Sequence, residues 1–450
     1  MKKSLFAAAA LSAFAGAANA QSSVTVYGIL DVGYLGQSAY NTNTSTATGN
    51  TFTRTTSNAI ANSPLQTSRL GFRGTEDLGG GMRSFFTIEL GLAPVNGNLS
   101  GGSTVLDTNQ NTTQGSGSAI DNRQTFIGLG QKGIGQVALG RQYTPVFTAG
   151  AATSPGQYNN ITGDVIYSNN TAMGSGTGMS AGQTMTNRAS NSITFLTDSM
   201  AGFRLGGMYA ISNSDSSLQA TGTANAPGTG ANSLTSSTGG GGNTNWNGWG
   251  LGGDYTWKKL YVNAAYQQFY TQYDAPIISS AAGGTYNISG AGATSGQSVG
   301  TTAVFAASNI VDKQFLAGGT YDFGILKAFV QYTSRNVINN SGNRAVAGSP
   351  TLVRSAQQIG ARSFVTPKIE LWGSVGNGSY QGANQATGIA GPKVEFTGYQ
   401  LGSNYILSKR TNMYAIFGNS SASSNTQGTA SLASGAGSAA SYAVGMRHTF

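Results

Sequence analysis

The 450-residue chain has no cysteine, one histidine and few charged side chains. Without cysteine it can form neither disulfides nor thiolate metal sites. The one histidine, His448, is third from the C-terminus, so a Ser/His/Asp arrangement lacks a suitable base. We therefore expect no enzyme activity, no cofactor and no metal site built on His and Cys. Charged residues are 9% of the chain, against about 25% in ordinary soluble domains, which argues against a soluble protein.

Long apolar runs are absent except at the N-terminus. Lys2 and Lys3 precede an apolar stretch over residues 5–17, and Ala18-Asn19-Ala20 fits a small-x-small cleavage site. This pattern predicts a secretory signal peptide over 1–20 and a mature chain over 21–450, with a short membrane anchor as the alternative. No later segment reaches the roughly 18 consecutive apolar residues of a transmembrane helix.

The charge balance is basic but carries no basic stripe. The formal net charge is +9, and the basic residues are scattered singly apart from Lys258-Lys259 and Lys409-Arg410. A nucleic-acid-binding domain would gather such residues on one face or along one helix. We expect no nucleic-acid partner.

A period of two runs through the chain. In SRLGFRGTEDLGGGMRSFFTIEL (68–90), Leu70 and Phe72 alternate with Arg69 and Arg73, and the same alternation continues after the Gly-rich turn. The pattern predicts a β-hairpin with one apolar and one polar face. It recurs to the C-terminus, where SYAVGMRHTF alternates in the same way.

Short and long connections alternate between these strands. Seven tight turns are predicted near 75–81, 130–135, 197–202, 257–259, 322–325, 365–368 and 407–411. Eight long Gly/Ser/Thr/Asn-rich loops are predicted near 36–66, 93–121, 142–187, 212–245, 271–312, 333–354, 377–393 and 419–438. Together they join sixteen strands in one domain. This anatomy is typical of an all-β, 16-stranded antiparallel transmembrane β-barrel with short periplasmic turns and long extracellular loops.

In such a barrel the opening hairpin is inside-out. Leu70, Phe72, Phe86 and Ile88 are expected to face lipid, whereas the charged side chains between them face a lumen, which in a sixteen-stranded barrel is wide enough for water. Aromatic residues near strand ends suit girdles at the two interfaces, although aromatics also favour strands in general: Tyr34, Trp246, Trp249, Tyr255, Tyr266, Tyr332, Tyr399 and Tyr405.

Four segments resemble the general porins of Gram-negative outer membranes, in the trimeric β-proteobacterial variant. They are VTVYGILDVGY (24–34), the hairpin at 68–90, DNRQTFIGLG…GQVALGRQYTP (121–144) and the ending VGMRHTF (444–450). The resemblance implies a homotrimer in which the third long loop, here 142–187, folds into each barrel and narrows the pore. It also implies that Phe450 is the C-terminal aromatic recognised by the barrel-assembly machinery.

The family carries an arginine cluster opposite the third loop, and the matching positions are Arg69, Arg123 and Arg188. Alternation independently places these three on the lumen face, with Arg123 opposite Phe126. The loop itself contains no Lys or Arg, and its one acid is Asp164.

Other expected lining residues are Arg73, Arg83, Glu89 and Arg141, the last at the root of the third loop. The alternative is that the arginines pair with acids such as Glu89 or with loop carbonyls and hold the loop in place. Both roles can coexist.

The expected function is a water-filled outer-membrane channel for passive diffusion of small hydrophilic solutes and ions, preferring anions because Arg clusters favour them. The alternative is a substrate-specific channel of the same fold. A surface adhesin of β-solenoid type would need a fixed internal repeat, which the sequence does not show.

Overall fold

The computed structural model describes residues 23–45, 49–95, 121–167, 185–216, 242–273, 308–339, 350–383, 390–422 and 437–450. The expected signal peptide, residues 1–20, lies outside these ranges. Within them almost all regular structure is β-strand, and α2 (Pro145–Thr153) is the one helix. No helix in this described part of the chain is long and apolar enough to cross a membrane.

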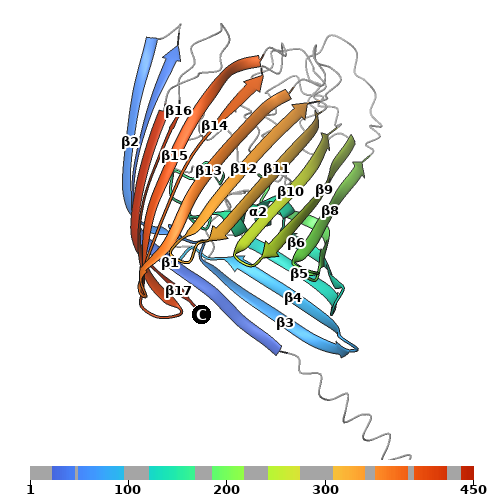
Figure 1. Cartoon of the computed structure of the whole chain (residues 1–450). Coiled ribbons are helices and arrows are strands. Elements are labelled where there is room, and N and C mark those ends of the chain that lie inside the picture. Colours follow the sequence, from blue (N-terminus) through green and yellow to red (C-terminus); the bar gives the residue numbers. More distant parts are fainter. Residues whose placement is uncertain are drawn as a thin grey trace, which may run out of the picture.

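The strands form one closed antiparallel sheet (Figure 1). They are β1 (Ser23–Ser45), β2 (Gly49–Asn62), β3 (Arg69–Gly79), β4 (Met82–Gly91), β5 (Asn122–Gln131), β6 (Gly135–Tyr143), β7 (Arg188–Thr197), β8 (Phe203–Ser216), β9 (Gly242–Trp257), β10 (Leu260–Tyr273), β11 (Ser308–Asp322), β12 (Lys327–Asn339), β13 (Pro350–Thr366), β14 (Ile369–Ala383), β15 (Ala390–Ile406), β16 (Thr411–Ala422) and β17 (Gly437–Thr449). From β3 onward each strand pairs with the next along the chain. β17 then pairs with β1, which confirms the expected closure of the wall and leaves no open edge.

Seventeen strand segments make a sixteen-strand wall, because β2 and β3 share one place in it. The first part of β1 pairs with β3, from Ser23↔Thr75 to Ile29↔Arg69. The rest of β1 pairs with β2, from Val32↔Asn62 to Ser45↔Gly49. β2 and β3 are therefore two pieces of the second wall strand, and the barrel has the predicted sixteen strands.

The interruption between the two pieces, residues 63–68, is held by Asp31 of β1. Asp31 has no exposed surface. Its Oδ2 accepts hydrogen bonds from the backbone N–H groups of Leu65 at 2.8 Å and Gln66 at 2.5 Å. Its Oδ1 accepts the Tyr414 hydroxyl at 2.6 Å. Three donors compensate the burial of this carboxylate, so the break is a built feature of the wall.

The seven tight turns lie where the sequence predicted them, each between two consecutive strands. The first predicted long loop, 36–66, is wrong in extent. β1 continues to Ser45, and β2 begins at Gly49, so this polar segment is mostly a strand pair. In Figure 1, β2 rises beyond its neighbours at the long-loop end. Most side chains of this segment are polar or small, so it lacks the apolar alternation that revealed the other strands.

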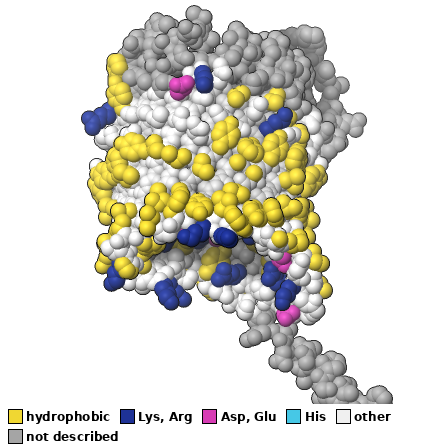
Figure 2. Space-filling model, viewed as in Figure 1, with side chains coloured by type: hydrophobic (Ala, Val, Ile, Leu, Met, Phe, Trp, Pro, Cys, Tyr) yellow, Lys and Arg dark blue, Asp and Glu magenta, His cyan; other side chains and the backbone are white. Residues whose placement is uncertain are grey.

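Apolar side chains form bands across the outer face of the barrel that Figure 2 shows. Leu129, Leu205 and Leu401 are each at least 55% exposed, as suits residues that face lipid. In the opening hairpin Ile88 is exposed and Glu89 buried, so the predicted inside-out arrangement is confirmed there. Trp246 departs from the expected girdle: it is 6% exposed and stacks on Phe269 within a buried cluster.

The described part of the connection between β6 and β7 lies against the inner wall. Thr144 caps α2, with its Oγ1 accepting from the Phe147 N–H, and Pro145 occupies the first helical turn, where its missing N–H costs nothing. The helix packs on β9, β10, β11 and β12. Residues 154–162 then follow the wall toward β17, where the Thr162 N–H donates to Ser441 Oγ at 2.9 Å. Residues 163–167 turn back toward β13, where the Val165 N–H donates to Gln358 Oε1.

Candidate functional site

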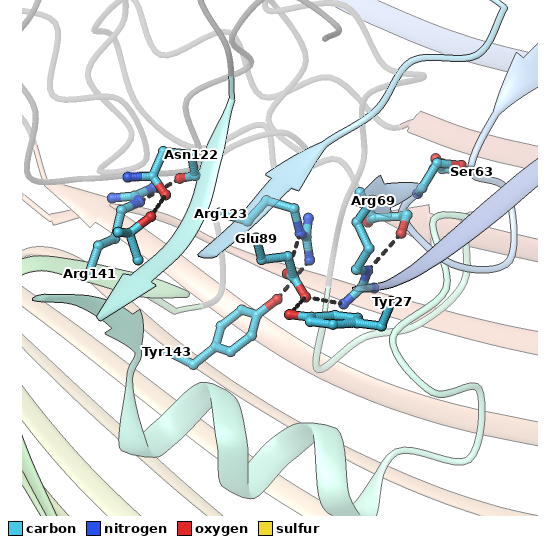
Figure 3. A network of polar contacts seen from close by, with 11 residues as sticks. Tyr27, Ser63, Arg69, Glu89, Asn122, Arg123, Arg141 and Tyr143 are labelled. Atoms are coloured by element: carbon cyan, nitrogen blue, oxygen red, sulfur yellow. Dashed lines mark hydrogen bonds and ion pairs between the residues drawn. The ribbon is translucent and has the colours of Figure 1, made fainter. Parts of the chain in front are cut away.

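Two arginines and two tyrosines meet around one carboxylate on the lumen face (Figure 3). Arg123 Nε lies 2.8 Å from Glu89 Oε1, and Arg69 Nη1 lies 3.7 Å from Glu89 Oε2. The Tyr27 hydroxyl donates to Glu89 Oε2 at 3.2 Å. Arg123 Nη2 also donates to the Tyr143 hydroxyl at 2.7 Å. The side chains of Arg123 and Glu89 are 6% and 4% exposed, so this ion pair is largely withdrawn from water.

Arg188 joins the cluster through Tyr143. Its guanidinium carbon lies 5.2 Å from the centre of the Tyr143 ring, a cation–π distance. The Tyr143 ring also stacks on Phe147 of α2, with centroids 4.6 Å apart. No ion pair of Arg188 occurs among the described contacts, and its buried Nε has no hydrogen-bond partner there. Arg188 is thus a cation that no described carboxylate neutralises.

A β-bulge brings Arg123 into this cluster. The register between β4 and β5 shifts between Glu89 and Leu90, so Arg123 falls out of the regular alternation. Phe126, expected on the opposite face, in fact contacts the lumen-facing Phe85 at 6.4 Å between ring centroids. The expected position of Arg123 is correct, but the simple period of two does not produce it.

Arg73 and Arg83 are on the lumen face, nearer the short turns. The Arg73 guanidinium lies 5.3 Å from the centre of the Tyr27 ring. Arg83 donates to Gln136 Oε1 at 3.1 Å and is exposed. The two residues extend the positive surface away from the Glu89 cluster toward the short-turn end.

Arg141 does not belong to the cluster, contrary to expectation. In β6, Val137 and Leu139 are exposed on the outer face, and Arg141 follows in the same alternation. Its Nε donates to the Asn122 carbonyl at 2.7 Å and its Nη1 to Ser190 Oγ at 2.8 Å. Figure 3 shows the Arg141–Asn122 pair on the other side of β5 from Glu89.

Asp164 does not face the arginines across the lumen, contrary to expectation. It is 4% exposed, and its Oδ1 accepts the N–H groups of Ile166 and Tyr167, each at 2.9 Å. Burial raises the pKa of its carboxyl, despite these bonds and the Arg354 charge nearby. The local turn directs this carboxylate toward the wall of β13, so it adds little negative potential to the lumen.

The wall formed by β11–β17 carries arginines that the sequence reasoning missed. Two of them, Arg354 and Arg447, donate to neutral groups, namely the Val165 carbonyl and the side chains of Asn412 and Gln66. The other two are paired with acids. Arg335 bonds Asp312 at 2.7 Å, and Arg362 lies 3.4 Å from Glu370. Sequence reasoning also missed Tyr27 and Tyr143 as cluster members. The signal for Tyr27 was present, because it alternates with the lipid-facing residues of the first strand.

The cluster is positive overall. Arg69, Arg123 and Arg188 meet one contacting carboxylate, that of Glu89. Asp121 also acts on Arg123 electrostatically, yet the cations still outnumber the acids. Because arginine stays charged at any working pH, this field persists across conditions.

A family model described as Gram-negative porin matches residues 7–425. Among curated relatives, an outer membrane porin protein of Bordetella pertussis is 32% identical over 227 residues, covering 49% of this chain and 51% of the relative. Outer membrane porin protein 32 of Delftia acidovorans is 35% identical over 236 residues, covering 51% and 54%. The chain thus spans about half the length of the curated relatives that it matches.

Solved structures share the fold over nearly the whole chain. An anion-selective porin from Comamonas acidovorans superposes with a TM-score of 0.56 at 20% identity, covering 96% of this chain and 100% of that one. OmpT of Vibrio cholerae, in a trimer form, gives 0.52 at 14% identity, covering 95% and 99%. At these identities the likeness concerns the fold alone. The family match, the relatives and the closed sixteen-strand barrel together show that the chain belongs to the Gram-negative porin family of the outer membrane.

Proposed function

We propose that the barrel is a water-filled channel for passive diffusion of small hydrophilic solutes and ions, and that it prefers anions. A sixteen-stranded barrel is wide enough for an aqueous lumen. Part of the third long connection lies inside it, where Phe147 of α2 stacks on Tyr143 of the arginine cluster. The Comamonas porin that shares this fold is anion-selective, which supports the same preference.

The observation that carries the anion preference is the excess of positive charge in the arginine cluster on one side of the lumen. Arg69 and Arg123 contact the carboxylate of Glu89, whereas Arg188, which lies over the Tyr143 ring, has no described counter-ion. On the other side Asp164 is turned into the wall. A carboxylate there would have drawn cations past the arginines. We therefore assign the constriction to Arg69, Arg123, Arg188 and Glu89, with Arg73 and Arg83 on the path toward the short turns.

Liposome swelling with purified protein tests the diffusion pore. For a general pore, influx should fall smoothly with the size of neutral sugars and rise linearly with solute concentration. A substrate-specific channel of the same fold would instead show saturation for one solute and a large advantage over others of equal size. Liposomes without protein, and liposomes carrying heat-denatured protein, are the matched controls.

We also propose a homotrimer held in outer-membrane lipid and inserted by the barrel-assembly machinery. The trimer form of a structural neighbour supports the oligomeric state. Mass determination of the detergent-solubilised protein by light scattering tests it. Three chains per particle are expected, and a monomer would contradict the proposal.

A further inference from the structure

Five wall glutamines share one unusual environment. Each comes from a different strand among β10–β15, none is more than 2% exposed, and each bonds the inward-folded connection: Gln267, Gln314, Gln331, Gln358 and Gln400. Glutamine is mostly an exposed residue in proteins, so five fully buried ones on one inner face call for a specific role.

Three of them bond the two ends of the connection, at α2 and at the return to β7. Gln267 Oε1 accepts the Val146 N–H at 3.1 Å, which is one of the free donors of the first turn of α2. Gln331 Nε2 donates to the Gly150 carbonyl at 2.8 Å. Gln314 Oε1 accepts the Thr186 N–H at 2.7 Å, where the chain returns to β7. Both ends of the connection are therefore tied to adjacent strands.

The other two hold the segment after the helix. Gln400 Nε2 donates to the Ile161 carbonyl at 2.6 Å and to the Thr162 carbonyl at 3.1 Å. Its Oε1 accepts Asn159 Nδ2 at 2.9 Å. Gln358 Oε1 accepts the Val165 N–H at 3.1 Å. These amides satisfy backbone groups that would otherwise be buried without partners in an irregular segment.

Glycines in the wall also let the connection approach the strands closely. A Cβ at Gly318 would overlap the Thr153 side chain, and a Cβ at Gly418 would overlap the Thr162 carbonyl. The connection therefore packs directly against the backbone of two widely separated strands, β11 and β16. This close approach is independent of the glutamine hydrogen bonds, and it indicates that the same segment is held in one position against the wall.

We propose that the five glutamines are positioning residues that clamp residues 144–167 and 185–187 to the wall, so that the pore has one fixed opening. This rests on the proposed diffusion pore and adds that the connection does not act as a gate. An amide suits the task because it both donates and accepts while adding no charge. The selectivity field is then left to the arginines.

The test uses single-channel recordings of the full-length protein in planar bilayers. Gln400→Met keeps the side chain's length but removes every amide bond, leaving the Ile161 and Thr162 carbonyls unsatisfied. Gln331→Met does the same at the helical end. The matched control is Gln357→Met, since Gln357 neighbours Gln358 but is exposed on the outer face and bonds Asn377 rather than the connection.

The wild type and the control should show one stable open level for each pore of the trimer. Gln400→Met and Gln331→Met should show partial closures about tenfold more often, because loss of a buried amide releases that part of the connection. Reversal potentials should stay unchanged, since no charge is altered. Open levels as steady as wild type in both variants would overturn the proposal, and so would failure of both to assemble. A wild type without conductance would instead refute the diffusion pore itself.

Discussion

Replacing Arg188 by glutamine should weaken the anion preference without unfolding the barrel. Arg188 is the member of the cluster with no ion pair among the described contacts, and its buried Nε lacks a partner. Its removal takes away one positive charge and leaves the Arg123–Glu89 pair intact. Stability should therefore change little. Arg123→Gln should cost more, up to about 3 kcal/mol, because the buried Glu89 carboxylate loses its nearest cation and keeps only Arg69 and the Tyr27 hydroxyl.

The size of the selectivity change follows from Coulomb's law. At about 6 Å in water a unit charge contributes about 0.7 kcal/mol, and screening at about 0.1 M salt reduces this to about 0.4 kcal/mol. The contribution has opposite sign for an anion and a cation. The permeability ratio should then shift about fourfold toward cations at 0.1 M, and less than about 1.5-fold at 1 M, where the Debye length is about 3 Å.

Reversal potentials across KCl gradients at the two salt levels measure this shift. The double variant Arg123→Gln with Glu89→Gln is the control, because it removes one charge of each sign and keeps the net charge of the cluster. Its selectivity should match the wild type, whereas Arg188→Gln should not. An unchanged ratio in Arg188→Gln at low salt would refute the assignment of the field to this cluster.

Three further predictions concern assembly and stability. Deleting Phe450, whose backbone pairs with Gly28 at the barrel closure, should lower the yield of heat-modifiable protein in the outer membrane more than Phe450→Leu does; equal yields would reduce Phe450 to an ordinary lipid-facing aromatic. Asp164→Asn should leave the reversal potential unchanged. The folded-state pKa of Asp164 is raised, so the folded protein disfavours the ionised carboxylate. The wild type should therefore lose stability relative to this variant as pH rises above about 4. A gap in melting temperature that is independent of pH would contradict this. Asp31→Ala should destabilise the barrel by at least about 3 kcal/mol in urea unfolding, since it frees the 63–68 break and buries unpaired N–H groups; a loss below about 1 kcal/mol would count against that role.

The strands and short turns of the wall could be predicted because they depend on residues that are close together in the sequence. Alternation placed Arg69, Arg73 and Glu89 correctly on the lumen face, and Gly-rich turns marked the short-turn end. The break held by Asp31 was not predictable, because it depends on a tyrosine nearly four hundred residues away. Arg123 reaches the cluster through a bulge, which a strict period of two cannot anticipate.

Inside the barrel the sequence revealed less. The single acid of the third long connection suggested a charge facing the arginines, yet a local turn buries Asp164 against the wall. Arg141 lies at the root of the connection in sequence, but strand alternation sends it outward. The role of the five glutamines could not be predicted, because a glutamine on a strand looks like any other polar wall residue until the segment that it binds is known.

We propose that uncompensated arginines at the inner wall give this porin a preference for anions. The reversal potential of the wild-type channel across a tenfold KCl gradient at low salt tests it most directly. We expect the sign that corresponds to chloride passing more readily than potassium, and the preference should shrink as the salt concentration rises. A channel that passes potassium more readily than chloride would contradict it.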